Sequence, residues 1–307
     1  MIVERVAVGE GTPEGTNSAY VLPDRGVVID PGPPTDDAWD DLRAGLDRAD
    51  VALADVEHVL VTHWHADHAG LAPRLAMEAD ATVAMGEDDA TLVADYAAER
   101  ENRLERDATA MRSWGVPHET VASVIAGDEP SSMSDTHPVE TLSDGDRVAG
   151  LEVLATLGHT LGHTAFGTAD VTFVGDAVLP TYTPNVGGSD TRTTDPLATY
   201  RDTLDRLEER PGRLLPGHGT SLESDRIDVV RAHHRERTER VTRTLEAIGP
   251  ATPWELACEL FGDLADVHVK FGAGEAAAHL ERLEREGTVE RVAREPVVYR
   301  RRAEFDS

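Results

Sequence analysis

The chain has 307 residues, 58 acidic against 29 basic, and a formal net charge of −29 at pH 7. Hydrophobic residues make up 40% of it, enough for a sizeable core, so a chain that is disordered throughout is excluded. No apolar run reaches the ~18 residues of a membrane-spanning helix, and the single cysteine, Cys258, cannot form an internal disulfide. We therefore expect a soluble cytoplasmic protein without a membrane partner, long enough for two domains.

The basic residues are almost all arginine, since Lys270 is the only lysine. The acidic excess runs through the whole chain and is not confined to one tail. This pattern favours a halophilic protein adapted to molar intracellular salt, where self-repulsion is screened. The alternative is an ordinary acidic cytosolic enzyme, and in either case overall acidity does not exclude a polyanionic substrate.

The first 125 residues predict strands that alternate with helices, followed by a helical insertion. β-branched runs between glycine and proline turns predict strands, and apolar residues at helical spacing predict helices. The expected strands are residues 5–8, 18–22, 26–30, 58–62 and 82–85, and the expected helices are 36–48 and about 71–77. Two charged helices, 88–114 and 116–125, then form an insertion that we expect over one face of the sheet.

The rest of the chain predicts more strands, two amphipathic helices and a separate C-terminal part. The expected strands are 147–148, 151–154, 171–174 and 213–216, and the expected helices are 196–209 and 224–248. Thr252 and Pro253 form a good helix start, and a second helix over 274–286 precedes two β-like runs, 289–292 and 297–300. Helices followed by a two-stranded hairpin suggest a small winged-helix module.

The strongest functional pattern is a run of histidines directly after an apolar strand. It places His63, His65, Asp67 and His68 within six residues. A loop at the end of a strand can turn all four side chains inward. Imidazole nitrogens and carboxylate oxygens are ligands of zinc, and they also suit iron or manganese. A chance cluster of surface histidines is the alternative, which the specific spacing disfavours.

Four more candidate residues follow predicted strands and lie beside glycines: Asp30, His159, Asp176 and His218. Glycine lets the backbone approach a crowded centre closely. An aspartate after a strand is usually only a turn residue, so none of the four is decisive alone. Together with the histidine run, and in this order along the chain, they predict a metal site.

These five elements in this order resemble those of the metallo-β-lactamase superfamily. The resemblance implies an α/β fold, a four-layer αββα sandwich with two divalent metal ions at one edge; zinc is the expected metal, with manganese or iron as alternatives. By position, the first metal would be held by His63, His65 and His159, and the second by Asp67, His68 and His218, with Asp176 bridging them. Antibiotic-degrading members tend to carry cysteine at the bridging position, so an aspartate there argues against an antibiotic substrate.

Asp30 and His163 take supporting places in the same resemblance. Asp30 would orient a metal ligand, and such partners matter to metal affinity. His163 lies four residues after His159, and spacing alone leaves either histidine as the ligand. The family pattern gives that place to His159, so we expect His163 to orient a ligand or contact substrate, with plain structural packing as the alternative.

The ligand set predicts metal-assisted hydrolysis. Two cations ~3.5–4 Å apart lower the pKa of a bridging water to near 7 and polarise a carbonyl or phosphoryl oxygen. Asp67 is the expected catalytic residue, which would orient the resulting hydroxide and pass its proton to the leaving group. No serine or cysteine nucleophile is needed for this reaction.

The tail narrows the resemblance to the beta-lactamase-like protein 2 group, through residues 251–256, 274–283 and 179–185. In that group some members cut single-stranded RNA, while many microbial ones are known only as similar to hydroxyacylglutathione hydrolases. The resemblance implies a catalytic domain over 1–223 with a helical insertion at about 88–125, a connecting helix over 224–249 and a winged-helix-like domain over 250–307.

Several functions stay open. A phosphodiesterase on single-stranded RNA needs arginines and stacking aromatics beside the metals, whereas a hydrolase of small acyl thioesters or esters needs a small closed pocket. The placement of Trp64, Tyr182, Arg192 and Arg201 would decide between them, and Tyr182 is the candidate substrate residue. An iron sulfur dioxygenase would fill only the first metal site. A DNA-binding regulator is disfavoured because the expected recognition helix is acidic. The winged helix would shape substrate entry or supply a homodimer face.

Overall fold

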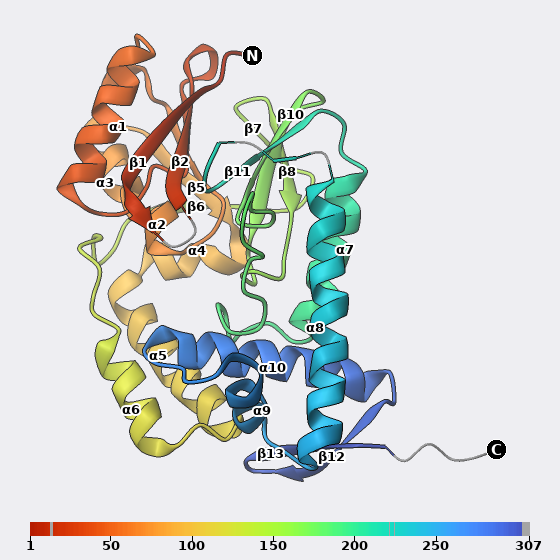
Figure 1. Ribbon diagram of the computed structural model, residues 1–307. Coiled ribbons are helices and arrows are strands. Elements are labelled where there is room, and N and C mark those ends of the chain that lie inside the picture. The colour runs from red at the N-terminus through yellow and green to blue at the C-terminus, as the bar shows by residue number, and fades with distance from the viewer. Residues whose placement is uncertain (13–14, 221, 224, 303–307) are drawn as a thin grey trace. The chain divides into compact units, whose positions relative to one another are not determined.

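The computed structural model describes residues 1–12, 15–220, 222–223 and 225–302, which form two compact units. The first unit consists of Met1–Arg100, Pro130–Pro184 and Thr203–Ile227, and the second of Glu101–Glu129, Asn185–Asp202 and Asp228–Ser307. Each unit is thus assembled from stretches that are far apart in the sequence, whose helices and strands are labelled in Figure 1.

The first unit contains two β-sheets. The six-stranded sheet keeps chain order: β1 (Glu4–Thr12), β2 (Gly15–Leu22), β3 (Val27–Ile29), β4 (His58–Val61), β5 (Thr82–Gly86) and β6 (Val139–Leu142). Strands β1 to β3 are antiparallel, and β3 to β6 are parallel. The five-stranded sheet has the order β11 (Arg213–Pro216), β10 (Val171–Gly175), β9 (Thr164–Gly167), β8 (Leu151–Ala155) and β7 (Arg147–Val148). Within it β10 and β11 are parallel, and the other pairs are antiparallel.

The two sheets pack against each other through apolar side chains that alternate along the strands. One buried cluster joins Tyr20 and Leu60 of the first sheet to Phe166 and Phe173 of the second, and the ring centroids of Tyr20 and Phe173 are 5.0 Å apart. The other face of the six-stranded sheet is covered by α1 (Asp36–Arg48) and α3 (Ala72–Ala79) (Figure 1). These layers form the mixed α/β arrangement that the sequence resemblance implies.

Helix α1 begins and ends at the predicted residues. Trp39, Leu42 and Leu46 are spaced to bury one helical face against the sheet. The hydroxyl of Thr35 accepts a hydrogen bond from the Ala38 amide at 3.2 Å, which satisfies one of the free amides at the helix start. Apolar spacing and cap therefore agree on the same boundaries.

The second unit is mostly helical. Its elements are the parts of α5 (Tyr96–Ser113), α7 (Pro196–Glu208) and α8 (Arg226–Ile248) that belong to it, with α6 (His118–Gly127), α9 (Pro253–Phe261), α10 (Val267–Arg285), β12 (Val289–Arg294) and β13 (Val297–Arg301). Thr252 and Glu255 form a capping box at the start of α9, as the sequence predicts. The antiparallel pair β12–β13 confirms the predicted strand pair at the end of the chain.

The charged segment after β5 differs from the prediction of one long helix. Helix α4 (Glu87–Ala94) ends at Asp95, whose backbone is not helical (φ −133°, ψ 54°), and α5 begins at the next residue. The part of the expected insertion from Glu101 onward, which includes most of α5 and all of α6, belongs to the second unit, and its expected place over a sheet stays a prediction. Met111 and Val121 of these helices are buried with Ala273 of α10 in one apolar cluster.

Two further differences from the prediction arise where glycines interrupt a helical pattern and where strands are too short to show an alternating pattern. Helix α10 begins at Val267, seven residues before the predicted start, because Gly272 and Gly274 lie inside it. A Cβ at Gly274 would lie only 2.5 Å from the Cα of Gly188, so this glycine permits close packing and does not end the helix. Strands β6 and β9 have four residues each and were not predicted.

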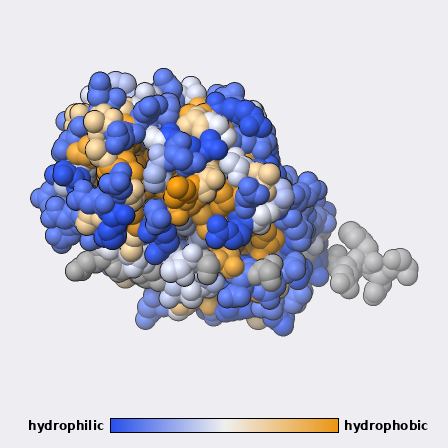
Figure 2. All heavy atoms as spheres, turned by 90° about the horizontal axis from the view of Figure 1, so that it is seen from above, coloured by the Kyte–Doolittle hydropathy of each residue, from blue (hydrophilic) through white to orange (hydrophobic). Residues whose placement is uncertain are grey.

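The surface agrees with the composition. The face drawn in Figure 2 is mostly hydrophilic, with hydrophobic residues gathered toward its middle. Within the part of the chain that the structure describes, no helix combines the length and the apolar character that a bilayer span requires.

Candidate metal centre

The histidine run lies in the turn between β4 and α2 (Ala66–Ala69). Strand β4 is buried and parallel to β3, so its carboxyl end lies beside Asp30. His63 is fully buried there, and His68 reaches the same region from α2. A strand that ends in a short turn and a helix therefore directs side chains from both elements toward one point.

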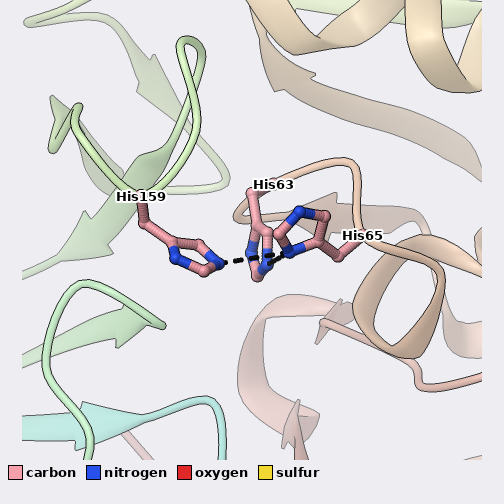
Figure 3. Close-up of side chains that lie close together, drawn as sticks. All are labelled: His63, His65 and His159. Carbon is pink, nitrogen blue, oxygen red and sulfur yellow. Dashed lines mark hydrogen bonds between the residues drawn. The ribbon is translucent and has the colours of Figure 1, made fainter. Parts of the chain in front are cut away.

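Three histidines converge from two loops, as Figure 3 shows. The Nε2 atom of His63 lies 3.0 Å from Nδ1 of His65, and Nε2 of His159 lies 3.1 Å from the same Nδ1. His159 comes from the loop between β8 and β9 of the other sheet. One Nδ1 offers either one proton or one lone pair, so it cannot satisfy two ring nitrogens, whereas a cation accepts a lone pair from each ring.

Asp67, His68 and His218 form a second group. The Nε2 atoms of His68 and His218 are 3.2 Å apart, and Oδ2 of Asp67 lies 3.5 Å and 3.4 Å from them. Asp176 lies between the groups, with Oδ1 3.4 Å from Nε2 of His68 and Oδ2 3.9 Å from Nε2 of His159. The structure therefore brings together all seven residues of the expected ligand set, and the metal that each would hold stays a prediction.

Asp30 supports this arrangement from behind. One of its oxygens accepts a hydrogen bond from the Thr62 amide at 2.7 Å. The other accepts one from the Thr62 hydroxyl at 2.7 Å and lies 3.0 Å from Nδ1 of His68. A carboxylate on Nδ1 fixes the ring so that Nε2 points to the site.

His163 and Tyr182 lie in different surroundings. Nδ1 of His163 is 2.7 Å from the Thr156 hydroxyl, and its Nε2 accepts a hydrogen bond from the Asp176 amide at 3.2 Å. Both ring nitrogens of His163 thus have protein partners, beside and not within the groups of possible ligands. Tyr182 is about half exposed (52%), and its carbonyl accepts a hydrogen bond from Arg226 at 2.6 Å. Both roles assigned from the sequence stay predictions.

Burial controls the charge of the first group. It lowers the pKa of His65 to about 3, and the neighbouring His159 adds to this effect. Burial, together with His68 and His65, also places the pKa of His63 well below its ordinary value. These two histidines are therefore neutral at neutral pH, with lone pairs available to a cation.

The second group has the opposite charge state. Burial opposes the positive charge of His68 and His218, but hydrogen bonds and charge from Asp176 and Asp67 overcome it. The pKa of His218 rises to about 9, and that of His68 lies well above its ordinary value. Burial likewise disfavours ionised Asp67 and Asp176, yet the facing histidines hold both pKa values below the ordinary one. Protons here supply the positive charge that a divalent cation would bring.

Two observations show that this donor set fits metal ions. A Cβ at Gly217 would lie 2.5 Å from Oδ1 of Asp176 and 2.6 Å from Cε1 of His68, so glycine is what lets this backbone pass. Oδ1 of Asp176 is buried, and the nearby Nε2 of His68, at 3.4 Å, does not give it a well-formed hydrogen bond, so a cation would satisfy this oxygen better. Nitrogen and carboxylate ligands suit zinc, manganese and iron alike.

The structure adds Asn17 to the site, a residue that sequence reasoning missed. Its side-chain amide donates to the carbonyl of Asp67 at 2.9 Å and to Oδ2 of Asp67 at 3.1 Å. Asn17 also pairs with His218 through a backbone bridge, and the next residue, Ser18, donates to the Gly217 carbonyl at 2.8 Å. In the sequence, the only sign of this role is that a polar residue, Asn17, directly precedes the predicted strand over residues 18–22.

Comparison with known families gives one match over most of the chain. A family model described as the metallo-beta-lactamase superfamily matches residues 11–218, a range that contains every residue of the site described above. Among curated proteins, "Probable metallo-hydrolase YqjP" of Bacillus subtilis is 27% identical over 305 residues, covering 92% of this chain and 93% of that protein. The "Beta-lactamase-like protein 2 homolog" of Drosophila melanogaster is 26% identical over 196 residues, 61% of this chain and 54% of its own length.

Solved structures resemble the chain over nearly its full length. A metallo-beta-lactamase family protein from Thermus thermophilus has a TM-score of 0.80 and 31% identity, covering 98% of both chains. A beta-lactamase domain protein from Burkholderia ambifaria has a TM-score of 0.74 and 24% identity, covering 98% of this chain and 91% of that one, and shares the fold.

Proposed function

The chain belongs to the metallo-beta-lactamase superfamily and is a metal-dependent hydrolase, and from this premise we propose that it uses two divalent metal ions to cleave phosphodiester bonds in single-stranded RNA. The observation that carries the two-metal part is that two of the three groups of possible ligands share no residue, while the third, His63, His68 and Asp176, overlaps both. One consists of His63, His65 and His159, and the other of Asp67, His68 and His218. Asp176 approaches members of both groups, which supports it as the bridge.

The residues of this site have separate tasks in the proposed reaction. A pair of bound divalent cations lowers the pKa of water toward neutrality and stabilises negative charge on a phosphoryl oxygen. Asp67 would orient the attacking water and carry its proton to the leaving group. Asn17 donates one hydrogen bond to the Asp67 carboxylate and one to its backbone carbonyl, which keeps Oδ2 toward His68 and His218.

Aromatic side chains support a nucleic-acid substrate over a small acyl group. The Trp64 ring contacts His65 with centroids 4.5 Å apart, in the turn that carries two candidate ligands. Tyr182 lies six residues after Asp176 and exposes about half of its surface, while Arg226 holds its carbonyl and that of Leu179. The Tyr182 ring can stack on a base with little loss of conformational freedom, because Arg226 restrains its segment, whereas the Trp64 ring packs partly against the core. The beta-lactamase-like protein 2 resemblance points the same way.

The end of the chain enters the proposal as a winged-helix module. Helices α9 and α10 share a buried cluster with Val289 of β12 and Tyr299 of β13. The hairpin arginines Arg300 and Arg301 are paired with Glu290 and Glu246, which leaves little charge for a nucleic-acid phosphate backbone. We propose that this module does not act as a DNA-binding regulator.

The test is cleavage of a labelled single-stranded RNA in molar potassium chloride with added zinc or manganese. Concentrated salt is used because a net charge of −29 is typical of a protein adapted to molar salt. The wild type should cut the RNA, Asp67→Ala should not, and Asp40→Ala, which removes an exposed acid of α1, should match the wild type.

A hydroxyacyl thioester is incubated with the same three proteins. If the protein hydrolyses the thioester and does not cut RNA, the proposed substrate is wrong and the assignment of the metal centre still holds. Full activity of Asp67→Ala on either substrate would contradict the assignment of the site itself.

A further inference from the structure

A buried carboxylate outside the candidate ligand set connects the two loops that carry the first histidine group. Asp89 lies in the first turn of α4 and is fully buried. We propose that Asp89 is a positioning residue that holds the loop of His63 and His65 and the loop of His159 at the spacing needed to share one cation. This inference rests on the proposed ligand set, and its test requires no substrate.

Three donors from these loops converge on Asp89. The Thr160 hydroxyl donates to Oδ2 at 2.6 Å, and the Trp64 amide donates to the same oxygen at 3.3 Å. The Gly162 amide donates to Oδ1 at 2.9 Å. Trp64 lies between the two ligand histidines of one loop, and Thr160 directly follows His159 in the other. One side chain therefore bonds next to all three members of the first group.

The backbone around Asp89 is packed so closely that the contact has little freedom. A Cβ at Gly162 would lie 2.3 Å from the Asp89 amide nitrogen and 2.8 Å from its Cγ. A Cβ at Gly86, just before α4, would lie 2.2 Å from the Gly162 carbonyl oxygen. Both positions thus require glycine, and they bring the start of α4 against the loop that carries His159.

A carboxylate suits this position better than an amide. Ionised aspartate offers only acceptors, and the Trp64 amide, the Thr160 hydroxyl and the Gly162 amide all donate to it. Asparagine has nearly the same shape but would turn an NH₂ group toward at least one donor, which would leave buried donors unpaired. The first turn of a helix also favours a negative charge, because amides at a helix start are not used within the helix.

The proposal predicts unequal effects on the two metal groups. Asp89 contacts the loops of the first group, while the second group is held by Asp30 on His68 and by Asn17 on Asp67. Loss of a residue that orients metal ligands typically lowers affinity by about 10–100-fold. Asp89→Asn should therefore weaken binding of the first ion to this extent and leave the second nearly unchanged.

The experiment measures zinc binding against a competing chelator, with metal content determined after equilibration. Cobalt(II) titration adds a spectroscopic signature, because its visible absorption reports the geometry of the ligands. Glu87→Gln is the matched control, since it removes one negative charge from the same helical turn but from an exposed side chain. It should bind both ions with wild-type affinity and give the wild-type cobalt spectrum.

A second variant keeps the inference testable if Asp89→Asn does not fold. Thr160→Val removes one donor and retains the side-chain shape, so it should weaken the first ion by about threefold to tenfold. If either folded variant binds both ions with wild-type affinity and gives the wild-type cobalt spectrum, Asp89 does not have the positioning role. Failure of the wild type to cut RNA would overturn the proposed substrate and leave this result unaffected.

Discussion

In the first unit, histidine nitrogens face one another and two carboxylates, whereas in the second unit buried ionisable groups lie singly or in pairs. Lys270 lies 2.9 Å from Asp107, and Arg237 lies 3.3 Å from Glu275. His279 in the second unit has its Nδ1 2.8 Å from the hydroxyl of Thr238. Buried atoms without a hydrogen bond among the described residues occur in both units, such as Oδ1 of Asp176 and Oε1 of Glu275, but two ring nitrogens facing the same Nδ1 are seen in the metal centre.

This difference shows which feature distinguishes a ligand site from a polar core. Burial lowers the pKa of His234 and His279 to about 3, as it does that of His65. Neutral buried histidines are therefore common to both units. Among the described residues, groups of ligand atoms close enough to share a metal ion are found in the first unit. In the second unit the ring centroids of His234 and His279 are 6.0 Å apart, and neither histidine belongs to such a group. Geometry, and not the perturbed pKa, identifies the functional cluster.

The largest expected effect comes from breaking the convergent cluster. Asp67→Ala or His65→Ala should lower kcat/KM by about 10³-fold or more, because each removes a candidate ligand and Asp67 is also the proposed catalytic group. The melting temperature of His65→Ala should fall little or rise, since the contacts between neutral histidine nitrogens do not stabilise the fold. Asp67→Ala should lower it, because the carboxylate faces the positively charged His68 and His218. Steady-state kinetics and thermal unfolding check both parts, and a collapse of the melting temperature of His65→Ala would contradict the second.

Breaking a pair in the second unit should have the reverse outcome. Lys270→Met leaves the Asp107 carboxylate buried with only the Thr191 hydroxyl and Arg103 near it. The free energy of unfolding should fall by about 3–5 kcal/mol. The double variant Lys270→Met/Asp107→Leu should recover most of this loss, and zinc content should stay that of the wild type. Denaturant unfolding measures the first result; equal stability of the single variant and the wild type would show that the pair has no such role.

The affinity for metal ions should depend on pH differently in the two groups of candidate ligands. The pKa of His218 is raised to about 9 and that of His68 lies well above its ordinary value, so at pH 7 protons must leave both rings before an ion binds, and affinity at the second group should rise by at least about 100-fold between pH 7 and 9. His65, with a pKa of about 3, is already neutral over this range, so affinity at the first group should be flat. Chelator competition at several pH values measures both, and parallel curves would contradict the division.

The smallest expected effect concerns the stability contributed by His234, a buried histidine of the second unit. His234 has a folded pKa of about 3 against an ordinary value of 6.5, so its stabilising contribution is complete above pH 6.5 and is lost as pH falls toward 3. At pH 5 the loss is about 2 kcal/mol for one histidine. His234→Phe should therefore lose less stability than the wild type between pH 7 and pH 5. Urea unfolding at the two pH values gives the difference, and identical losses would disprove it.

The sequence predicts this molecule well where local pattern and tertiary contact agree. Helix α1 has its apolar face and its Thr35 cap in one short segment. The seven candidate ligands are found because each follows a strand in a known order. Asn17 and Asp89 are missed because their importance depends on loops that approach them from distant parts of the chain. The early start of α10 is missed because close packing at Gly274, which local propensity does not contain, outweighs the cost of glycine in a helix.

The hydrogen bonds between β2 and the segment after β11 have a consequence for biosynthesis. Ser18 bonds to the carbonyls of Gly217 and Gly219, about two hundred residues later in the chain. A nascent chain cannot close this part of the first unit until Gly219, of its 307 residues, has left the ribosome. Such high contact order slows folding, so the N-terminal strands wait with unpaired edges that could pair with another chain.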